Sequence, residues 1–138
     1  MRITIIGAGS MGCLYGARLA AQGHQISLLD IRADVVDAIN RTGLVLDGVS
    51  GRLEIAARAT LPDDAVETAD LVSVHAHTEG TADAARVASR ILAPDGGAIT
   101  LQNGIGNGEA LIEAVGRHRV LGGAPGRVPS RRRRRRIR

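Results

Sequence analysis

The chain has 138 residues, 44% of them hydrophobic and 23% charged, a composition typical of one folded domain rather than of a disordered or fibrous chain. Its single cysteine, Cys13, excludes a disulfide framework and a cysteine-based zinc site, and no metal site is predicted. No stretch reaches the roughly 18 apolar residues of a membrane span, and the apolar run at residues 3–6 is too short for a signal peptide. We therefore expect a cytoplasmic protein that does not enter a membrane.

The net charge of +4 is unevenly distributed along the sequence. All 18 basic residues are arginines and eight of them lie in residues 127–138, after the last of the 14 acidic residues. Residues 1–126 therefore carry 10 arginines against 14 acids, a net charge of −4. Six consecutive arginines repel one another and predict a disordered tail over residues 124–138. We interpret the tail as an abbreviated or frame-shifted end; a nucleic-acid-binding arm is the less favoured alternative, because no aromatic residue interrupts the arginines.

Short apolar runs alternate with amphipathic stretches as far as about residue 123. The predicted elements are, in chain order, a strand at 1–6, a helix that ends near Gly23, a strand at 26–29, a helix closed by Thr42 and Gly43, a hairpin that pairs 44–46 with 53–55, a strand at 71–75, a helix at 82–92, a strand at 98–101, a helix at 107–115 and a strand at 119–121. Strands that alternate with helices at this spacing predict βαβ units. We therefore expect residues 1–123 to form an α/β domain, with a Rossmann-type, doubly wound, mainly parallel sheet and helices on both faces.

Two details of the predicted helices follow from single side chains. In the first helix, Met11, Leu14, Tyr15 and Leu19 recur at helical spacing, so they predict the face that packs against the sheet. In the last helix, Asn107 is predicted to cap the N-terminus, because an Asn side chain can accept hydrogen bonds from the free N–H groups there.

Residues 7–12 read Gly-Ala-Gly-Ser-Met-Gly between the first predicted strand and the first predicted helix, which is the pattern of a dinucleotide-binding loop. In this pattern Gly7 permits the tight turn, Gly9 lets the backbone approach a pyrophosphate, and Gly12 permits close packing of the helix on the sheet. Free N–H groups at the helix N-terminus favour the anion. The predicted cofactor-binding loop consists of Gly7, Ala8, Gly9, Ser10, Met11 and Gly12.

Two charged residues at the end of the second strand bear on the choice of coenzyme. Asp30 lies 18 residues after Gly12, close to the separation of about 20 expected of the acid that accepts the ribose hydroxyls. Its carboxylate repels a 2′-phosphate and favours NAD, whereas Arg32 can pair with that phosphate and favours NADP. Both Asp30 and Arg32 are predicted cofactor-binding residues, and the residues alone leave the choice of coenzyme open.

Three segments carry a resemblance to a known family. Residues 7–19 (GAGSMGCLYGARL) resemble the start of ketopantoate reductases (2-dehydropantoate 2-reductases), residues 101–107 (LQNGIGN) resemble their LQNGxGN segment, and residues 119–123 (RVLGG) resemble the strand that follows it. The resemblance implies that NADPH donates hydride to the keto carbon of 2-dehydropantoate, a small 2-keto acid of pantothenate biosynthesis. It also implies that Asn103 faces cofactor and substrate, with Gln102 as structural support beside it, and it moves the preferred coenzyme to NADP, with NAD possible.

The sequence departs from the family pattern in two ways. His77 stands where family members carry a lysine after the strand at 71–75, and the chain contains no lysine. We predict His77 and Asn103 as the catalytic residues, since an imidazole titrates near neutrality, whereas His75 is interpreted as a packed or hydrogen-bonded residue. The second departure is length: the resemblance implies a helical second domain with a general-acid lysine, and we expect the 138 residues to lack that domain.

The resemblance therefore predicts a truncated N-terminal NAD(P)-binding domain of a 2-dehydropantoate 2-reductase-like oxidoreductase. This domain is expected to be inactive alone, because hydride transfer to a carbonyl needs a positioned substrate and a proton source within hydrogen-bond reach. Two alternatives stay open: a non-catalytic dinucleotide-binding or regulatory module, and a nucleic-acid-binding protein that acts through its arginine tail. No sequence feature predicts the oligomeric state.

Overall fold

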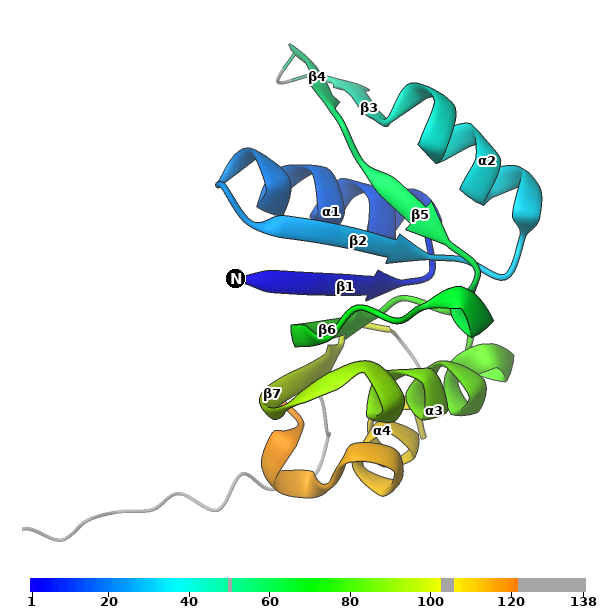
Figure 1. Ribbon diagram of the computed structural model, residues 1–138, viewed down its shortest axis with the longest axis vertical. Helices are drawn as coiled ribbons and strands as arrows, with labels where there is room; N and C mark the ends of the chain where they lie inside the picture. The colour runs from blue at the N-terminus through cyan, green and yellow to red at the C-terminus, as the bar shows by residue number, and fades with distance from the viewer. Residues whose placement is uncertain (50, 103–105, 122–138) are drawn as a thin grey trace, which may run out of the picture.

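A sheet of five parallel strands forms the centre of the protein, and a two-stranded antiparallel hairpin lies beside it (Figure 1). The computed structural model describes residues 1–49, 51–102 and 106–121, so the predicted tail at 124–138 lies outside the described residues. In chain order the elements are β1 (Arg2–Ile6), α1 (Ser10–Ala21), β2 (Gln25–Leu29), α2 (Ala33–Thr42), β3 (Leu44–Gly48), β4 (Gly51–Ile55), β5 (Arg58–Thr60), η1 (Pro62–Asp64), β6 (Ala69–Val74), η2 (Thr78–Gly80), α3 (Thr81–Ile91), β7 (Leu92–Thr100), α4 (Asn107–Val115) and η3 (Arg117–Arg119). The predicted alternation of strands and helices is confirmed.

The order of the strands makes the sheet doubly wound. It runs β5-β2-β1-β6-β7, so the chain leaves the central strand β1 in one direction, crosses over, and continues from β6 in the other. Pairing is parallel throughout the sheet, as between Ile5 and Leu28 on one side of β1 and between Ile5 and Ser73 on the other. This is the Rossmann-type topology predicted from the sequence, and its switch point lies between the carboxyl ends of β1 and β6.

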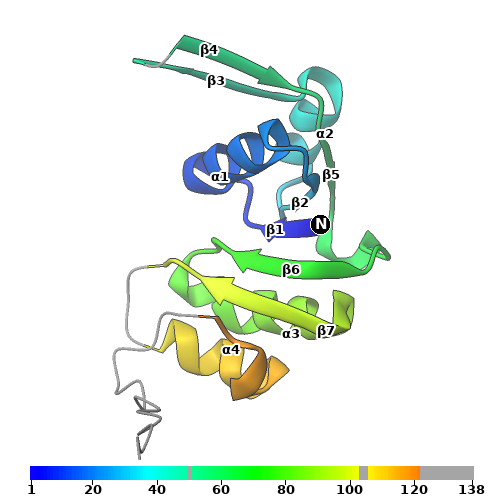
Figure 2. The same ribbon diagram turned by 90° about the vertical axis from the view of Figure 1, so that its left-hand side faces the viewer.

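Helices cover both faces of the sheet. Successive residues of a strand point to opposite faces of the sheet. In β1, Ile5 faces α1, since a Cβ built on Gly16 would lie 3.3 Å from Ile5 Cδ1. Ile6 points to the other face, in one core cluster with Ala84 and Ala88 of α3. The α1 and α2 side chains belong to one core and those of α3 and α4 to the other; Figure 2 shows the two pairs of helices on opposite sides of the β1–β6 boundary. Each core consists of Val, Ile, Leu and Ala side chains, with one Tyr and no Phe or Trp in the whole sequence.

The face of α1 that contacts the sheet differs from the prediction. Its buried residues are Gly12, Gly16 and Ala17. Met11 is 53% exposed, and Leu14 and Tyr15 are each 37% exposed. Helix α1 lies so close to the preceding loop that a Cβ on Gly12 would stand 1.9 Å from the Gly7 carbonyl oxygen. Only the smallest residues fit this contact, so the predicted apolar face was wrong, and its larger side chains lie outside the core.

The start of α4 also differs from the prediction. Gly106, with φ +93°, precedes the helix, and Asn107 is its first residue and 2% exposed. The Asn107 side-chain oxygen accepts a hydrogen bond from the Thr81 hydroxyl at 3.1 Å. The prediction of Asn107 as the N-cap was therefore wrong, because its side chain is bound to a residue 26 positions away in the sequence.

Several strand boundaries depart from the sequence pattern. The short strand β5 was missed, and β7 begins before the Pro-Asp-Gly-Gly run, with a shift in its register on β6 between Ala69 and Leu71. Residues 119–121 were predicted as a strand, but Arg119 ends η3 and Val120 makes a single parallel bridge to Ala98. The predicted hairpin between 44–46 and 53–55 is confirmed by the pairing of β3 with β4.

Candidate functional site

Four neighbouring strands of the sheet end at the same edge, and the segments that follow them form the candidate site. The last paired residues of these strands are Leu29, Ile6, Val74 and Thr100. Because the strands are parallel, Asp30 after β2, the glycine loop after β1, His75 after β6 and Gln102 after β7 follow one another along this edge. In open α/β sheets ligands bind at the carboxyl edge, at the switch point of the strand order.

The three glycines of the loop have different surroundings. Gly7 has φ +101°, and a Cβ there would stand 2.7 Å from the carbonyl carbon and oxygen of His75. Gly12 is pressed against the Gly7 carbonyl, as described above. Gly9 has φ −74°, which any residue can adopt, and a Cβ there would meet no described atom within 4 Å. The fold therefore requires glycine at positions 7 and 12, whereas the space in front of Gly9 is open.

Asp30 connects the glycine loop to the start of α2. It is 7% exposed, and its Oδ2 accepts a hydrogen bond from the Ala8 N–H at 2.9 Å. Its Oδ1 accepts one from the Arg32 N–H at 2.9 Å, and the Arg32 Nε lies 3.4 Å from the same oxygen. The Arg32 side chain is 59% exposed. The two charged residues predicted as cofactor-binding thus form one unit, in which Asp30 is buried and Arg32 reaches solvent.

Ser10 and Met11 begin α1 and are exposed at the same edge. Cys13, one turn into the helix, donates a hydrogen bond from its thiol to the Ala8 carbonyl oxygen at 3.2 Å. Burial, with the negative charge of Asp30, raises the pKa of the Cys13 thiol. A thiol that stays protonated is a poor nucleophile, so Cys13 supports the loop rather than chemistry.

His75 is packed and hydrogen-bonded, as predicted. Its Nε2 lies 2.8 Å from the Ser73 Oγ, and its ring stacks on Tyr15 of α1 with ring centroids 5.3 Å apart and planes at 28°. Burial lowers the pKa of His75, which favours the neutral imidazole. The stack also explains why Tyr15 is only partly exposed outside the core.

The two residues predicted as catalytic are placed differently. His77 follows His75 on the segment after β6 and is exposed, and its carbonyl oxygen accepts hydrogen bonds from the Gly80 N–H at 2.8 Å and from the Thr81 hydroxyl at 3.3 Å. Asn103 lies outside the described residues. Its described neighbour Gln102 is half-buried and hydrogen-bonded to Thr81 and Thr100, which agrees with the supporting role predicted for it.

A polar network beneath these residues escaped the sequence analysis. It joins Thr100 at the end of β7, Gln102, Thr81 at the start of α3 and Asn107 at the start of α4. The only hint in the sequence is that polar residues follow two apolar strands, because the partners lie 21 and 26 residues apart.

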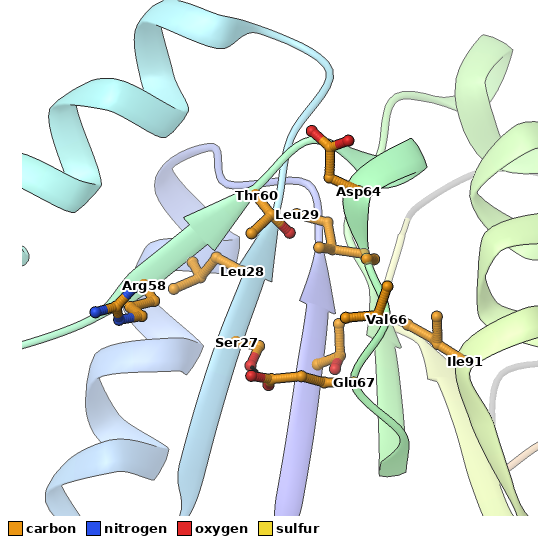
Figure 3. Close-up of a pocket in the computed structure, with 11 residues that line it drawn as sticks. Ser27, Leu28, Leu29, Arg58, Thr60, Asp64, Val66, Glu67 and Ile91 are labelled. Carbon is orange, nitrogen blue, oxygen red and sulfur yellow. Dashed lines mark hydrogen bonds between the residues drawn. The ribbon is translucent and has the colours of Figure 1, made fainter.

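A hollow of about 150 Å³ lies elsewhere, on the face of the sheet opposite α1 (Figure 3). Its lining includes Thr4, Ser27 and Glu67, and the Ser27 hydroxyl donates a hydrogen bond to Glu67 Oε2 at 2.8 Å. None of the predicted site residues lines it. Over residues 1–49, 51–102 and 106–121 no group of three or more His, Cys, Asp or Glu side chains is arranged to hold a metal ion, and no helix is both long and apolar enough to cross a membrane.

Comparison with known sequences matches most of the chain to one family. The family described as Ketopantoate reductase PanE/ApbA matches residues 3–125. A 2-dehydropantoate 2-reductase of Pyrococcus horikoshii is 37% identical over 117 residues, which cover 85% of this chain and 38% of the relative. The same enzyme of Halobacterium salinarum is 34% identical over 125 residues, which cover 89% of this chain and 41% of the relative. The chain thus spans about two fifths of the length of these curated relatives.

Solved structures with the same fold include members of that family. A PanE/ApbA family ketopantoate reductase from Ralstonia eutropha superposes with a TM-score of 0.76 and 35% identity, over 84% of this chain and 39% of that one. A complex of D-mandelate dehydrogenase with NADH and anilino(oxo)acetate superposes with a TM-score of 0.81 over 87% of this chain and 39% of that one. At 24% identity, this second likeness supports the fold alone.

Proposed function

The chain belongs to the ketopantoate reductase PanE/ApbA family, whose pattern spans residues 3–125, and we propose that it is the coenzyme-binding domain of a 2-dehydropantoate 2-reductase. The contrast among the loop glycines carries the proposal. Gly7 and Gly12 are required by contacts within the fold, whereas Gly9 has an ordinary conformation beside open space. A glycine in that setting fits the close approach of a dinucleotide pyrophosphate, which the first N–H groups of α1 would bind.

Arg32 favours NADPH over NADH. Its exposed guanidinium lies at the end of β2, where the ribose of the adenosine half is held in this fold. Asp30 is already bound to the Ala8 and Arg32 N–H groups, and the neighbouring guanidinium offsets its negative charge. A guanidinium pairs strongly with a phosphate, and only NADPH carries the 2′-phosphate.

His77 and Asn103 are the proposed catalytic residues at the other half of the edge. NADPH, when bound, supplies the hydride that reduces the 2-keto acid. The carbonyl oxygen then needs a proton from a group within hydrogen-bond reach, and the exposed His77 imidazole is proposed to hold it. Asn103 is proposed to donate a hydrogen bond to the substrate or coenzyme.

The 138-residue chain, tested by itself, is proposed to bind NADPH without reducing 2-dehydropantoate at an appreciable rate. It contains no lysine, and it spans about two fifths of the length of its curated relatives. Substrate positioning and electrostatic stabilisation each contribute several kcal/mol to enzymatic rates. A dinucleotide-binding module without turnover is the second candidate function, favoured by a histidine where the family has a lysine.

Calorimetric titration of the purified chain with NADPH and with NADH tests the proposal. We expect both to bind, with NADPH about tenfold tighter, and Arg32→Gln to remove most of this preference. Arg52→Gln is the matched control, because Arg52 is also exposed and paired with acids but lies in the β3–β4 hairpin. Failure of both dinucleotides to bind would overturn the proposed function, and tighter binding of NADH would overturn the choice of coenzyme.

A further inference from the structure

Four polar side chains at the β6–β7 half of the carboxyl edge form a chain of hydrogen bonds. The Thr100 hydroxyl lies 3.0 Å from Gln102 Oε1, the Gln102 Nε2 lies 3.4 Å from the Thr81 hydroxyl, and that hydroxyl lies 3.1 Å from Asn107 Oδ1. Three of the four residues are almost completely buried: Thr81 is 3% exposed, Thr100 4% and Asn107 2%. Buried polar side chains need hydrogen-bond partners, so the fold requires this network.

The hydroxyl of Thr81 has one hydrogen to donate, and three acceptors lie within hydrogen-bond distance of it. Its shortest acceptor is Asn107 Oδ1 at 3.1 Å, compared with 3.3 Å to the His77 carbonyl and 3.4 Å to Gln102 Oε1. The amide group of Gln102 then donates to Thr81, and its oxygen accepts from Thr100. Each side chain donates to the next, from Thr100 through Gln102 and Thr81 to Asn107, and such chains strengthen by mutual polarisation.

This chain joins the segment that carries His77 to Gln102 and to the start of α4. Thr81 begins α3, four residues after His77, and it touches the His77 carbonyl. Gln102 and Asn107 lie on either side of residues 103–105 in the sequence. Thr81 thus lies within hydrogen-bond distance of His77 on the segment after β6, of Gln102 and of Asn107.

We propose that Thr81 is a positioning residue, whose hydroxyl sets the segment after β6, together with Gln102 and the start of α4, for the nicotinamide half of a bound dinucleotide. This inference rests on the proposed function. The two halves of a Rossmann-type sheet each hold one mononucleotide, and Asp30 with Arg32 marks the β2 side as the adenosine half. Thr81 lies on the other half, so the residues that its hydroxyl holds would face the nicotinamide mononucleotide and not the adenosine.

The test compares NADPH with 2′-phospho-ADP-ribose, a fragment that lacks the nicotinamide ring. Calorimetric titration of Thr81→Val, which keeps the side-chain shape and removes the hydroxyl, is expected to show NADPH binding weakened by about tenfold and fragment binding unchanged within about twofold. Thr81→Ser restores the hydroxyl and is expected to restore NADPH affinity. Thr42→Val is the matched control, since the Thr42 hydroxyl bonds only within α2 and its own turn.

The outcomes distinguish a failure of the positioning role of Thr81 from a failure of the proposed function. A Thr81→Val protein that binds NADPH as tightly as wild type, or that loses NADPH and fragment affinity by the same factor, would overturn the positioning role. Wild-type protein that binds neither ligand would overturn the proposed function and, with it, this inference. If circular dichroism shows that Thr81→Val does not fold, Gln102→Leu breaks the same hydrogen-bond chain at a half-buried position. Its affinities for NADPH and for 2′-phospho-ADP-ribose are then compared in the same way.

Discussion

The two halves of the carboxyl edge are built by different means. Backbone geometry dominates the β1–β2 half, where Gly7 has φ +101°, Gly12 contacts the Gly7 carbonyl, and Asp30 holds the N–H of Ala8. Side chains dominate the β6–β7 half, where a buried hydrogen-bond chain joins three elements. The glycine turns of the first half lie in one short motif, which Asp30 joins from 22 residues away. In the second half the hydrogen bonds of Thr81 reach partners 21 and 26 residues away, and no local motif marks them.

The largest expected effect is in the backbone-built half, from Gly12→Ala. The added Cβ would stand 1.9 Å from the Gly7 carbonyl oxygen, so helix and loop must separate, and we expect a loss of about 3 kcal/mol or more in the free energy of unfolding. Urea denaturation measures it. Gly48→Ala is the control, because a Cβ on Gly48 meets nothing within 4 Å. Equal stability of the two variants would show that α1 is not held against the loop.

Asp30→Asn is expected to lower the free energy of unfolding by about 2 kcal/mol. The carboxylate accepts hydrogen bonds from two backbone N–H groups, and an amide can replace only one of its two oxygens. The same denaturation experiment applies. Asp47→Asn in the hairpin, where the carboxylate is 73% exposed, is expected to change stability by less than about 0.5 kcal/mol. A loss no greater than that of Asp47→Asn would contradict the anchoring role of Asp30.

Thr81→Val removes a hydroxyl from the β6–β7 half of the edge and is expected to lower the free energy of unfolding by about 1.5 kcal/mol. The reason is that, in a buried setting, Gln102 loses an acceptor and Asn107 loses a donor. Thr42→Val again serves as the control. A stability equal to that of wild type would mean that the network contributes nothing to folding.

The smallest expected effect is the pH dependence due to His75, which lies at the boundary of the two halves. Burial lowers the pKa of His75 below the ordinary 6.5. The neutral imidazole therefore contributes fully to the free energy of unfolding above pH 6.5, and this contribution is lost as pH falls through the lowered pKa. His75→Gln removes this titration. Urea denaturation at about pH 7.5 and about pH 5.5 is expected to show that the free energy of unfolding falls less between these two pH values in the variant than in wild type. The other histidines are present in both proteins, so their effects cancel, and equal losses would refute the assignment.

Local features of the site were predictable from the sequence. The strand, glycine loop and helix of residues 1–21 and the place of Asp30 at the end of β2 follow from spacing and from the conformational freedom of glycine. The parallel, doubly wound sheet with helices on both faces follows from the alternation of strands and helices.

Features that depend on distance between elements were not predictable. Met11 and Leu14 have the spacing of a buried face, but α1 approaches the sheet too closely for them, and glycine is buried instead. Asn107 has the position of a cap, but Thr81 takes its side chain. In both cases a tertiary contact prevailed over a valid local preference.

The most direct test of the central claim, that one dinucleotide spans both halves of this edge, is NMR mapping of backbone amides during titration with NADPH. Both ligands are expected to shift the amides of residues 7–12 and 30–32. NADPH is also expected to shift residues 75–81 and 106–108, whereas 2′-phospho-ADP-ribose, which lacks the nicotinamide ring, is expected to leave these unchanged. Amides beside the hollow on the opposite face, such as those of Ser27 and Glu67, are expected to stay unchanged. Shifts that gather around that hollow, or NADPH shifts that never reach residues 75–81, would contradict the account.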